Sequence, residues 1–290
     1  MADTVAPVTR PVPAPHSARE PARAARTPGS LVLRGVAMVY VGLLVLLPVA
    51  VILYRTFQPG LNVFFAALDS PEALHAFQMT GIVALSAVVI NTVFGVAVAV
   101  LLARYRFWGR RLLSAFVDLP VSVSPIVVGL ALVLVFGPTG WLGPFVEHHG
   151  VTMIGAKPGM IVATVFVSLP LVVRALVPVL EQSGMEQEQA AASLGASAVT
   201  RLRRITLPTI RAALTYGVVL SLARCIGEYG AVLVVSNNIE GQTETAPLRV
   251  GNLVENELNY NAAYAITFVL IIVAFAAILL SAWIRRRRRS

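Results

Sequence analysis

The sequence is nearly devoid of cysteine and lysine and has few charged residues of any kind. Cys225 is the only cysteine, Lys157 is the only lysine, and charged residues make up 13% of the 290 positions. A single cysteine excludes an intramolecular disulfide and a cysteine-based metal site. A lysine followed by Pro158 cannot belong to a phosphate-binding loop of the G-x-x-x-x-G-K-[ST] type. Soluble domains carry about 25% charged residues, so we do not expect a soluble ATPase.

The hydrophobic residues, 57% of the chain, are gathered in long uninterrupted runs. A helix that crosses a hydrocarbon core of about 30 Å needs about 20 apolar residues. Six segments meet this requirement, and their runs lack the period-two alternation of a β-barrel wall. We therefore predict an all-α integral membrane protein whose permease domain, residues 31–284, has six transmembrane helices. They are expected at 31–54, 79–103, 112–136, 159–180, 211–235 and 262–284.

The basic residues predict how the helices are oriented. Eighteen of the 23 lysines and arginines lie in the N-terminal part through Arg34, in residues 104–111, in residues 181–211 or after the sixth span, whereas Arg55, Lys157 and Arg249 occupy the other loops. By the positive-inside rule both termini face the cytoplasm, across the cell membrane. Because the arginines do not gather on one amphipathic face, the net charge of +9 does not indicate nucleic-acid binding. Residues 1–30 are expected to form a disordered cytoplasmic tail and 285–290 a basic cytoplasmic end.

Apart from Arg34 and Arg211 at the ends of spans, four charged residues lie inside the predicted spans: Asp118, Arg174, Arg224 and Glu228. Each would cost about 2.5 to 3.5 kcal/mol at a lipid-facing helix centre, so these side chains should face protein or a water-filled path. Arg224 and Glu228 are one helical turn apart and can pair. Two interpretations stay open, a structural pair or, together with Arg174, a translocation path or gate for an anion. A secondary transporter that uses these charges for ion coupling is an alternative of a different class.

Residues 181–210 have the pattern of two short helices joined by a turn. Ser183 and Glu186 fit a capping box at the start of the first helix, and Gly195 fits the left-handed position beyond its end. Ser197 can cap a second helix, which Pro208 would end. Local chemistry alone fits an ordinary surface helical hairpin equally well.

The spacing in this loop resembles the cytoplasmic coupling loop of the permease subunits of ABC importers. The signature of that loop is Glu-Ala-Ala, three residues, Gly, nine residues, Ile-x-Leu-Pro, and it is matched here by Ala190, Ala191, Gly195, Ile205, Leu207 and Pro208. The position of the signature Glu is occupied by Gln189, and Glu188 precedes it, turned by about 100° around a helix. The resemblance implies that these eight residues couple the chain to a separate ATPase subunit.

A second segment resembles a narrower group. Residues 225–236, Cys-Ile-Gly-Glu-Tyr-Gly-Ala-Val-Leu-Val-Val-Ser, and the following loop through Glu244, Pro247 and Leu248 are similar to the permeases of sulfate/thiosulfate importers. The similarity is closer to the CysW-type subunit than to its partner and extends over most of residues 35–284. Molybdate and tungstate permeases share much of the pattern, which leaves them as the alternative.

These resemblances imply a type I ABC-importer permease that is not itself an enzyme. Such a chain needs no cofactor or metal, because ATP and Mg²⁺ are bound by the partner ATPase. The implied assembly contains a second permease of the homologous T type, two ATP-binding subunits and an extracytoplasmic sulfate-binding protein. A fixed spacing of this kind favours the importer over the secondary transporter, which requires no coupling loop.

Overall fold

The computed structural model describes residues 28–286, and this part of the chain contains helices and connecting loops but no strand. Five of its helices are long and apolar enough to cross a membrane, or six if one sharply bent pair is a single span. The all-α prediction is confirmed. The expected tail, 1–30, and basic end, 285–290, fall mostly outside the described residues.

Four of the predicted spans are found as single helices. They are α1 (Pro28–Phe57), α3 (Pro71–Arg104), α7 (Lys157–Gln182) and α13 (Tyr260–Arg286), with the short α2 (Leu61–Leu68) before α3. Ser70 begins α3, because its side chain accepts a hydrogen bond from the backbone of Ala73, and Pro71 fits the first turn. The chain divides between Ala50 and Val51 into two units, so most of α1 belongs to the first unit. The packing described below is that of the second unit.

The third predicted span, 112–136, is wrong as a single helix. It is divided into α4 (Arg110–Ser122) and α5 (Pro125–Phe136), which are bent by 115° relative to each other. The residue before a proline is pushed out of the helical region, and Ser124, before Pro125, is accordingly non-helical, as is Val123. Pro120 remains inside α4, so only one of the two prolines breaks the helix.

The fifth predicted span, 211–235, is also divided. The helix α10 (Leu207–Ile226) ends before Gly227, and α11 (Gly230–Ser236) begins three residues later. Glu228 lies in this break and accepts a hydrogen bond from the backbone N–H of Ala231 at 2.9 Å, which caps the new helix. Backbone that is not helical within a membrane must be enclosed by protein or line a water-filled cavity. Both breaks are therefore candidate functional positions.

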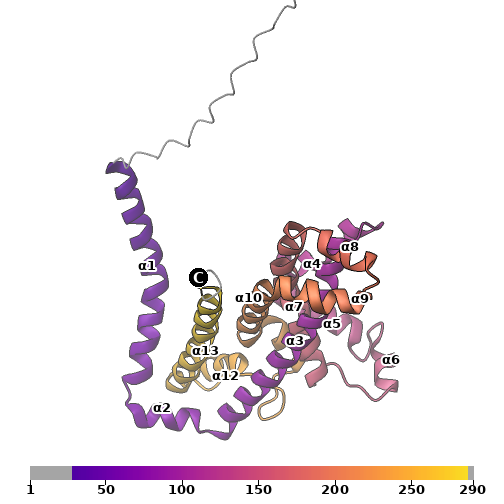
Figure 1. The fold of residues 1–290 in the computed structure, drawn as a ribbon. Helices are drawn as coiled ribbons and strands as arrows, with labels where there is room; N and C mark the ends of the chain where they lie inside the picture. Colours follow the sequence, from indigo (N-terminus) through magenta and orange to yellow (C-terminus); the bar gives the residue numbers. More distant parts are fainter. Residues whose placement is uncertain (1–27, 287–290) are drawn as a thin grey trace, which may run out of the picture. The chain divides into compact units, whose positions relative to one another are not determined.

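At the centre of the second unit, α7 packs against α3 and α10, which also contact each other (Figure 1). Two glycines permit this close approach. A Cβ atom on Gly95 of α3 would lie 2.7 Å from Cγ1 of Val172 on α7, and one on Gly217 of α10 would lie 3.2 Å from the Cα atom of the same valine. Small residues at such contacts let helix backbones approach closely in a membrane.

A buried polar cluster adds directional contacts to this bundle. Asn91 of α3 donates to the hydroxyl of Ser168 on α7 at 2.7 Å, and the thiol of Cys225 on α10 donates to the same oxygen at 3.2 Å. Ser168 itself donates to the carbonyl of Thr164. A polar side chain in an apolar interior needs such partners, so the cluster helps to specify how the three helices align.

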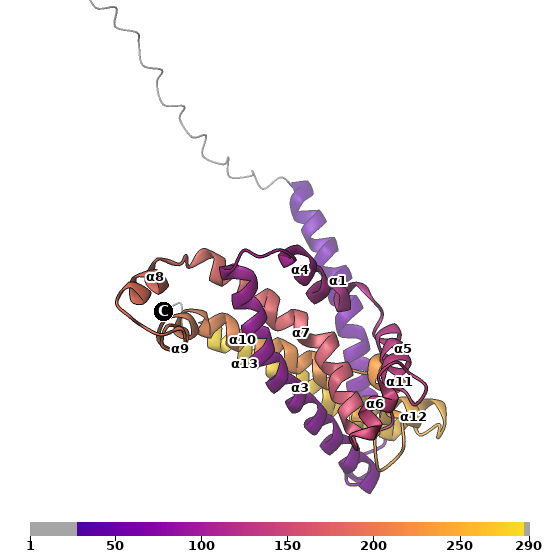
Figure 2. The same ribbon diagram turned by 90° about the vertical axis from the view of Figure 1, so that its right-hand side faces the viewer.

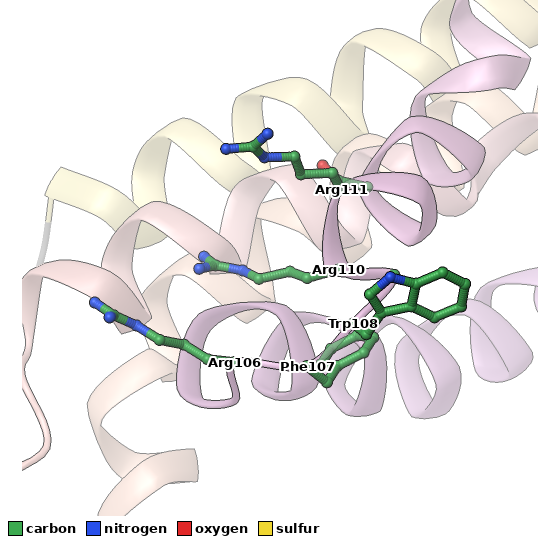
Figure 3. A pocket seen from close by; sticks show the side chains of 7 residues that line it. Arg106, Phe107, Trp108, Arg110 and Arg111 are labelled. Atoms are coloured by element: carbon green, nitrogen blue, oxygen red, sulfur yellow. The ribbon is translucent and has the colours of Figure 1, made fainter.

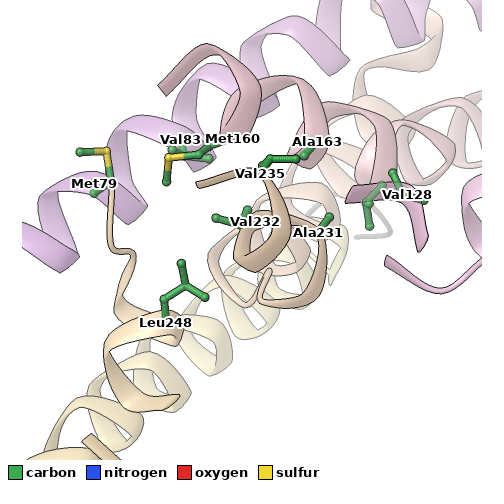
Figure 4. Packing of buried hydrophobic residues seen from close by; sticks show 10 residues of the cluster. Met79, Val83, Val128, Met160, Ala163, Ala231, Val232, Val235 and Leu248 are labelled. Carbon is green, nitrogen blue, oxygen red and sulfur yellow. The ribbon is translucent and has the colours of Figure 1, made fainter. Parts of the chain in front are cut away.

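A second core lies where the helices that follow the two breaks meet. The shorter helices α5 and α11 pack against each other, and Gly129 of α5 lies directly over Ala231 and Val234 of α11. Figure 4 shows the apolar cluster that surrounds this contact: Met79, Val83, Val128, Met160, Ala163, Ala231, Val232, Val235 and Leu248. Leu248 comes from α12 (Ala246–Glu255). The cluster thus joins both broken segments to the long helices α3 and α7.

We predict that Gly95→Leu destabilises the protein by about 1–3 kcal/mol, because the new side chain must displace Val172 from the α3–α7 contact. Gly81→Leu is the matched control, since Gly81 lies on the same helix and a Cβ there would meet nothing within 4 Å. Thermal unfolding in detergent measures both. Equal melting temperatures for the two variants would show that α3 and α7 do not depend on this close approach.

Candidate functional site

The predicted coupling loop lies at one end of the helical bundle, opposite the end that carries α6 (Gly143–His148), α11 and α12 (Figure 2). Its first half is α8 (Glu186–Ser193). Gly195 has φ +84°, its N–H bonds the carbonyl of Ala192, and the N–H of Ala196 bonds the carbonyl of Ala191, each at 2.9 Å. These two bonds form a Schellman motif, which favours glycine at the left-handed position that Gly195 occupies. The left-handed position predicted for Gly195 is confirmed.

Two predictions about the limits of this loop are wrong. Ser183 does not cap α8, because α7 continues to Gln182 and Ser183 ends it, with Gly184 in the left-handed region behind it. Pro208 does not end the second helix. Ser197 begins α9 (Ala198–Arg201), which passes through a π-helical turn, η1 (Leu202–Thr206), into α10 without a break. The loop proper is therefore shorter than 181–210.

The π-helical turn explains how the helix tolerates Pro208. Proline lacks the N–H that would bond the carbonyl four residues earlier, and a wider turn directly before it relieves the mismatch. Ile205 lies in that turn, while Leu207 packs beside Ile210 and Leu180 in the core of the bundle. The second half of the motif thus anchors the loop to the membrane helices.

Glu188 is held by a buried arginine that the sequence analysis counted only as a loop cation. Arg104, at the end of α3, forms a salt bridge with Glu188 at 3.1 Å. Arg104 also donates to the carbonyl of Leu180 at 2.7 Å and to the hydroxyl of Ser183 at 3.0 Å. Thr206 donates to the same Glu188 oxygen at 3.0 Å. This Arg104–Glu188 clasp connects the ends of α3 and α7 with α8 and the π-helical turn.

Gln189 lies on a different face of α8 from Glu188. Gln189 and Ala190 are exposed, whereas Glu188 is partly buried against Arg104. The sequence analysis predicted this difference in direction, and the structure confirms it. Beside them lie two exposed apolar side chains, Leu194 at 89% and Val199 at 62% exposure. The loop therefore uses one carboxylate internally and presents both apolar and charged side chains outward, the charged ones including Glu186, Arg203 and Arg204.

The intramembrane charges are found as two separate pairs. Arg224 and Glu228 form a salt bridge at 2.5 Å, as the one-turn spacing predicted, and Glu228 is buried. Arg174 of α7 forms a bidentate salt bridge with Asp118 of α4, in which Nε lies 2.6 Å from Oδ1. Ser114 accepts a further hydrogen bond from Arg174 at 3.3 Å.

The structure does not bring Arg174 and Arg224 together. Arg174 lies eight residues before the end of α7 that leads into the coupling loop. Arg224 lies near the opposite end of α10, two residues before Ile226. Each arginine is neutralised by its own carboxylate, so the two do not form a single anion site. Glu228 has a second task as the cap of α11, which sequence spacing alone did not reveal.

A further ionic cluster, in which Arg249 and Glu244 are buried, lies at the end of the bundle away from the coupling loop. Arg249 of α12 forms salt bridges with Glu257 at 2.5 Å, with Glu240 at 3.0 Å and, at 4.0 Å, with Glu244. Glu244 is fully buried and accepts from Asn252 at 2.6 Å. Burial raises the pKa of the Glu244 carboxyl, and the Asn252 hydrogen bond and Arg249 oppose that shift. The cluster fixes the loop between α11 and α12.

The arrangement as a whole, broken helices inside a membrane bundle and a structured loop at one end, is that of a membrane transport subunit. Residues 91–290 match the family model described as "Binding-protein-dependent transport system inner membrane component". This match covers more than half of the chain, which therefore belongs to that family of permease subunits.

Individual relatives agree with this family. The chain is 40% identical over 262 residues to "Sulfate transport system permease protein CysW" of Synechococcus elongatus, covering 89% of this chain and 92% of that protein. The CysW protein of Escherichia coli K12 is 42% identical over 251 residues, 85% of this chain and 86% of that protein. The CysT protein of Salmonella typhimurium is 36% identical over 244 residues, 84% of this chain and 88% of that protein.

Solved structures support the fold. A chain of a bacterial ABC transporter involved in the import of the acidic polysaccharide alginate superimposes with a TM-score of 0.72, covering 89% of this chain and 96% of that chain at 17% identity. A chain of the MetNI methionine ABC transporter in an inward-facing conformation gives a TM-score of 0.53 at 17% identity, with 74% and 93% covered. The chain therefore has the type I fold of ABC-importer permeases.

We predict that Arg104→Met and Glu188→Gln each destabilise the protein by on the order of 3 kcal/mol, because each leaves a buried charge without its partner. The double variant should lose less than the sum of the two changes. Arg110 and Glu181 provide a matched control, since their salt bridge has a similar length, 3.0 Å, but side chains that are 39% and 50% exposed, against 6% and 14% in the clasp. A double-mutant cycle of detergent melting measures both pairs. Additive effects at 104 and 188 would contradict the clasp.

For the pair in the helix break, we predict that Arg224→Ala and Glu228→Ala each impair folding or assembly, whereas Arg224→Met combined with Glu228→Gln restores them. The glutamine can still accept from Ala231, and no unpaired charge remains. We expect the double variant to transport normally, which would make the pair structural. Normal assembly without substrate uptake would instead assign Arg224 to the translocation path.

Proposed function

We propose that this chain is the CysW-type permease subunit of an ATP-driven importer of sulfate, with thiosulfate as a second substrate. The observation that carries the proposal is the identity of 40–42% to CysW proteins over at least 85% of the chain, against 36% to a CysT protein. The difference favours the CysW side of a heterodimer. The second permease would then be a T-type homologue.

ATP hydrolysis is assigned to two separate ATP-binding subunits, which hold ATP and Mg²⁺. The surface of α8 and α9 exposes the large apolar side chains of Leu194 and Val199 beside alanines and Glu186, and such exposed apolar side chains suit a protein partner better than solvent. Gln189 can contribute hydrogen bonds but no charge to that contact. The clasp would carry the movement of the docked loop to α3 and α7.

The coupling loop is assigned to the cytoplasmic side of the cell membrane. Arg104 contacts Glu188 and Arg110 contacts Glu181, so the two internal arginine-rich segments share one end of the bundle. Under the positive-inside rule that end is cytoplasmic, and both termini lie on the same side. The opposite end would receive an extracytoplasmic sulfate-binding protein, in keeping with the family description and with an alginate transporter structure that contains its bound periplasmic protein.

The substrate prediction can be tested in proteoliposomes that contain this chain, its T-type partner and the ATPase subunits, with the sulfate-binding protein added. We expect radiolabelled sulfate to enter only when ATP is supplied, and unlabelled thiosulfate to compete. ATP-driven molybdate uptake without sulfate uptake would overturn the substrate assignment and favour the molybdate permeases.

A matched pair of variants in the same assay tests whether the loop is needed for ATP-driven uptake, independently of which anion is the substrate. Gly195→Val places a β-branched residue at φ +84° in the loop and should abolish uptake, because such residues strongly disfavour that region. Gly150→Val is the matched control, because it introduces similar strain at φ +75° but at the other end of the bundle, away from the coupling loop. Uptake by a well-assembled Gly195→Val complex would remove the loop from the mechanism, whatever the substrate.

A further inference from the structure

Between α3 and α4 the chain forms a short basic and aromatic connection, residues 105–109, which the transport function leaves without a role. It borders a hollow of about 670 Å³. The hollow is lined by Arg106, Phe107, Trp108, Gly109, Arg110, Arg111 and Ser114 (Figure 3). Gly109 makes the turn into α4 with φ +96°, and Trp108 is fully exposed. An exposed tryptophan at the end of a membrane helix is typical of the headgroup level of a bilayer.

The charge of this connection is largely unneutralised. Arg110 contacts Glu181, but in residues 28–286 no carboxylate lies within salt-bridge distance of Arg106 or Arg111. Figure 3 shows the three guanidinium groups extended toward one side and the indole of Trp108 turned to the other. Guanidinium groups bind phosphate oxygens through charge-assisted hydrogen bonds. The hollow is thus complementary to an anion.

An apolar strip next to the arginines distinguishes a lipid from a free anion. Leu112 and Phe116 lie one turn apart on α4, directly after Arg111, and their side chains are 61% and 58% exposed. A free anion would not contact this apolar surface. The acyl chain of a lipid, in contrast, would cover it while the lipid phosphate contacts the arginines. Basic pockets at the cytoplasmic ends of membrane helices are known to bind anionic headgroups in this way.

We propose that residues 105–111 bind the phosphate of an anionic phospholipid, with Leu112 and Phe116 against its acyl chain and Trp108 at the interface. This assignment goes beyond sulfate import and takes from the proposed function only the placement of the connection in the cytoplasmic leaflet. The contacts of Arg104 and Arg110 place the bound lipid next to the coupling loop.

The proposal can be tested by the fluorescence of Trp108 in the full-length chain. The chain has three tryptophans, so Trp141→Phe with Trp283→Phe leaves Trp108 as the only fluorophore. Two series of phosphatidylcholine nanodiscs are prepared. One contains increasing small fractions of phosphatidylglycerol with brominated acyl chains, and the other contains the same fractions of brominated phosphatidylcholine. We expect brominated phosphatidylglycerol to quench Trp108 at roughly tenfold lower mole fraction, because two arginines favour the anionic lipid.

Variants then assign the selectivity to this site. Arg106→Gln with Arg111→Gln should make the two brominated lipids quench equally. Arg203→Gln with Arg204→Gln removes the same charge from exposed positions on the coupling-loop side and should leave the selectivity unchanged. Thermal unfolding verifies that both double variants fold.

Four results would each overturn the proposal. The first is equal quenching of Trp108 by the two brominated lipids when the site is unaltered, and the second is an equal loss of selectivity in the Arg203 and Arg204 control. The third is abolition of selective quenching by soluble glycerol phosphate at constant ionic strength. The fourth is complete protection of Trp108 from brominated lipid when the ATPase subunit is bound. The third would assign the hollow to a soluble anion and the fourth to the ATPase contact. Because the assay contains neither sulfate nor ATP, a failure here does not affect the transport proposal, and a failure of sulfate uptake does not affect this one.

Discussion

The bundle depends on the close contact of α7 with α3 and α10. Lipid chains are as apolar as leucine, so burial of apolar surface does not by itself bring helices together in a membrane. Here the association rests on Gly95 and Gly217, which let two backbones approach Val172, and on the polar cluster of Asn91, Ser168 and Cys225. The clasp at Arg104 and the packing of α5 on α11 are both built on these three helices.

The two ends of this bundle use charge differently. At the coupling-loop end, the Arg104–Glu188 clasp holds one short helix against two long ones through a few directed contacts. At the other end, Arg249 is surrounded by three carboxylates that fasten the α11–α12 connection. Between them, Arg174 pairs with Asp118 where both side chains are roughly half exposed, and Arg224 pairs with the buried Glu228. Neither Arg174 nor Arg224 is therefore left as a bare positive charge for an anion.

The sequence predicted the six apolar segments, the pairing of Arg224 with Glu228 and the left-handed Gly195, because length, one-turn spacing and glycine chemistry are local properties. The two helix breaks were missed because proline and glycine are common in membrane helices, and only tertiary contacts decide which of them interrupts the chain. Pro125 breaks a helix where Pro120 and Pro208 do not. The partner of Glu188 was missed for a similar reason. Arg104 is 84 residues away in sequence and looked like one more loop arginine of the kind that sets membrane orientation.

The uninterrupted helix from Ala198 to Ile226 has a mechanical consequence. Its 29 residues extend over about 43 Å, from the coupling loop to the break that contains Glu228. The tight contact of Gly217 with α7 divides this rod into arms of about 29 Å and 14 Å. If the contact acts as the fulcrum, a displacement at the loop reappears at Arg224 in the opposite direction and at about a third of the amplitude. The π-helical turn lies on the long arm, so deformation of this turn would absorb part of the displacement before it reaches Gly217.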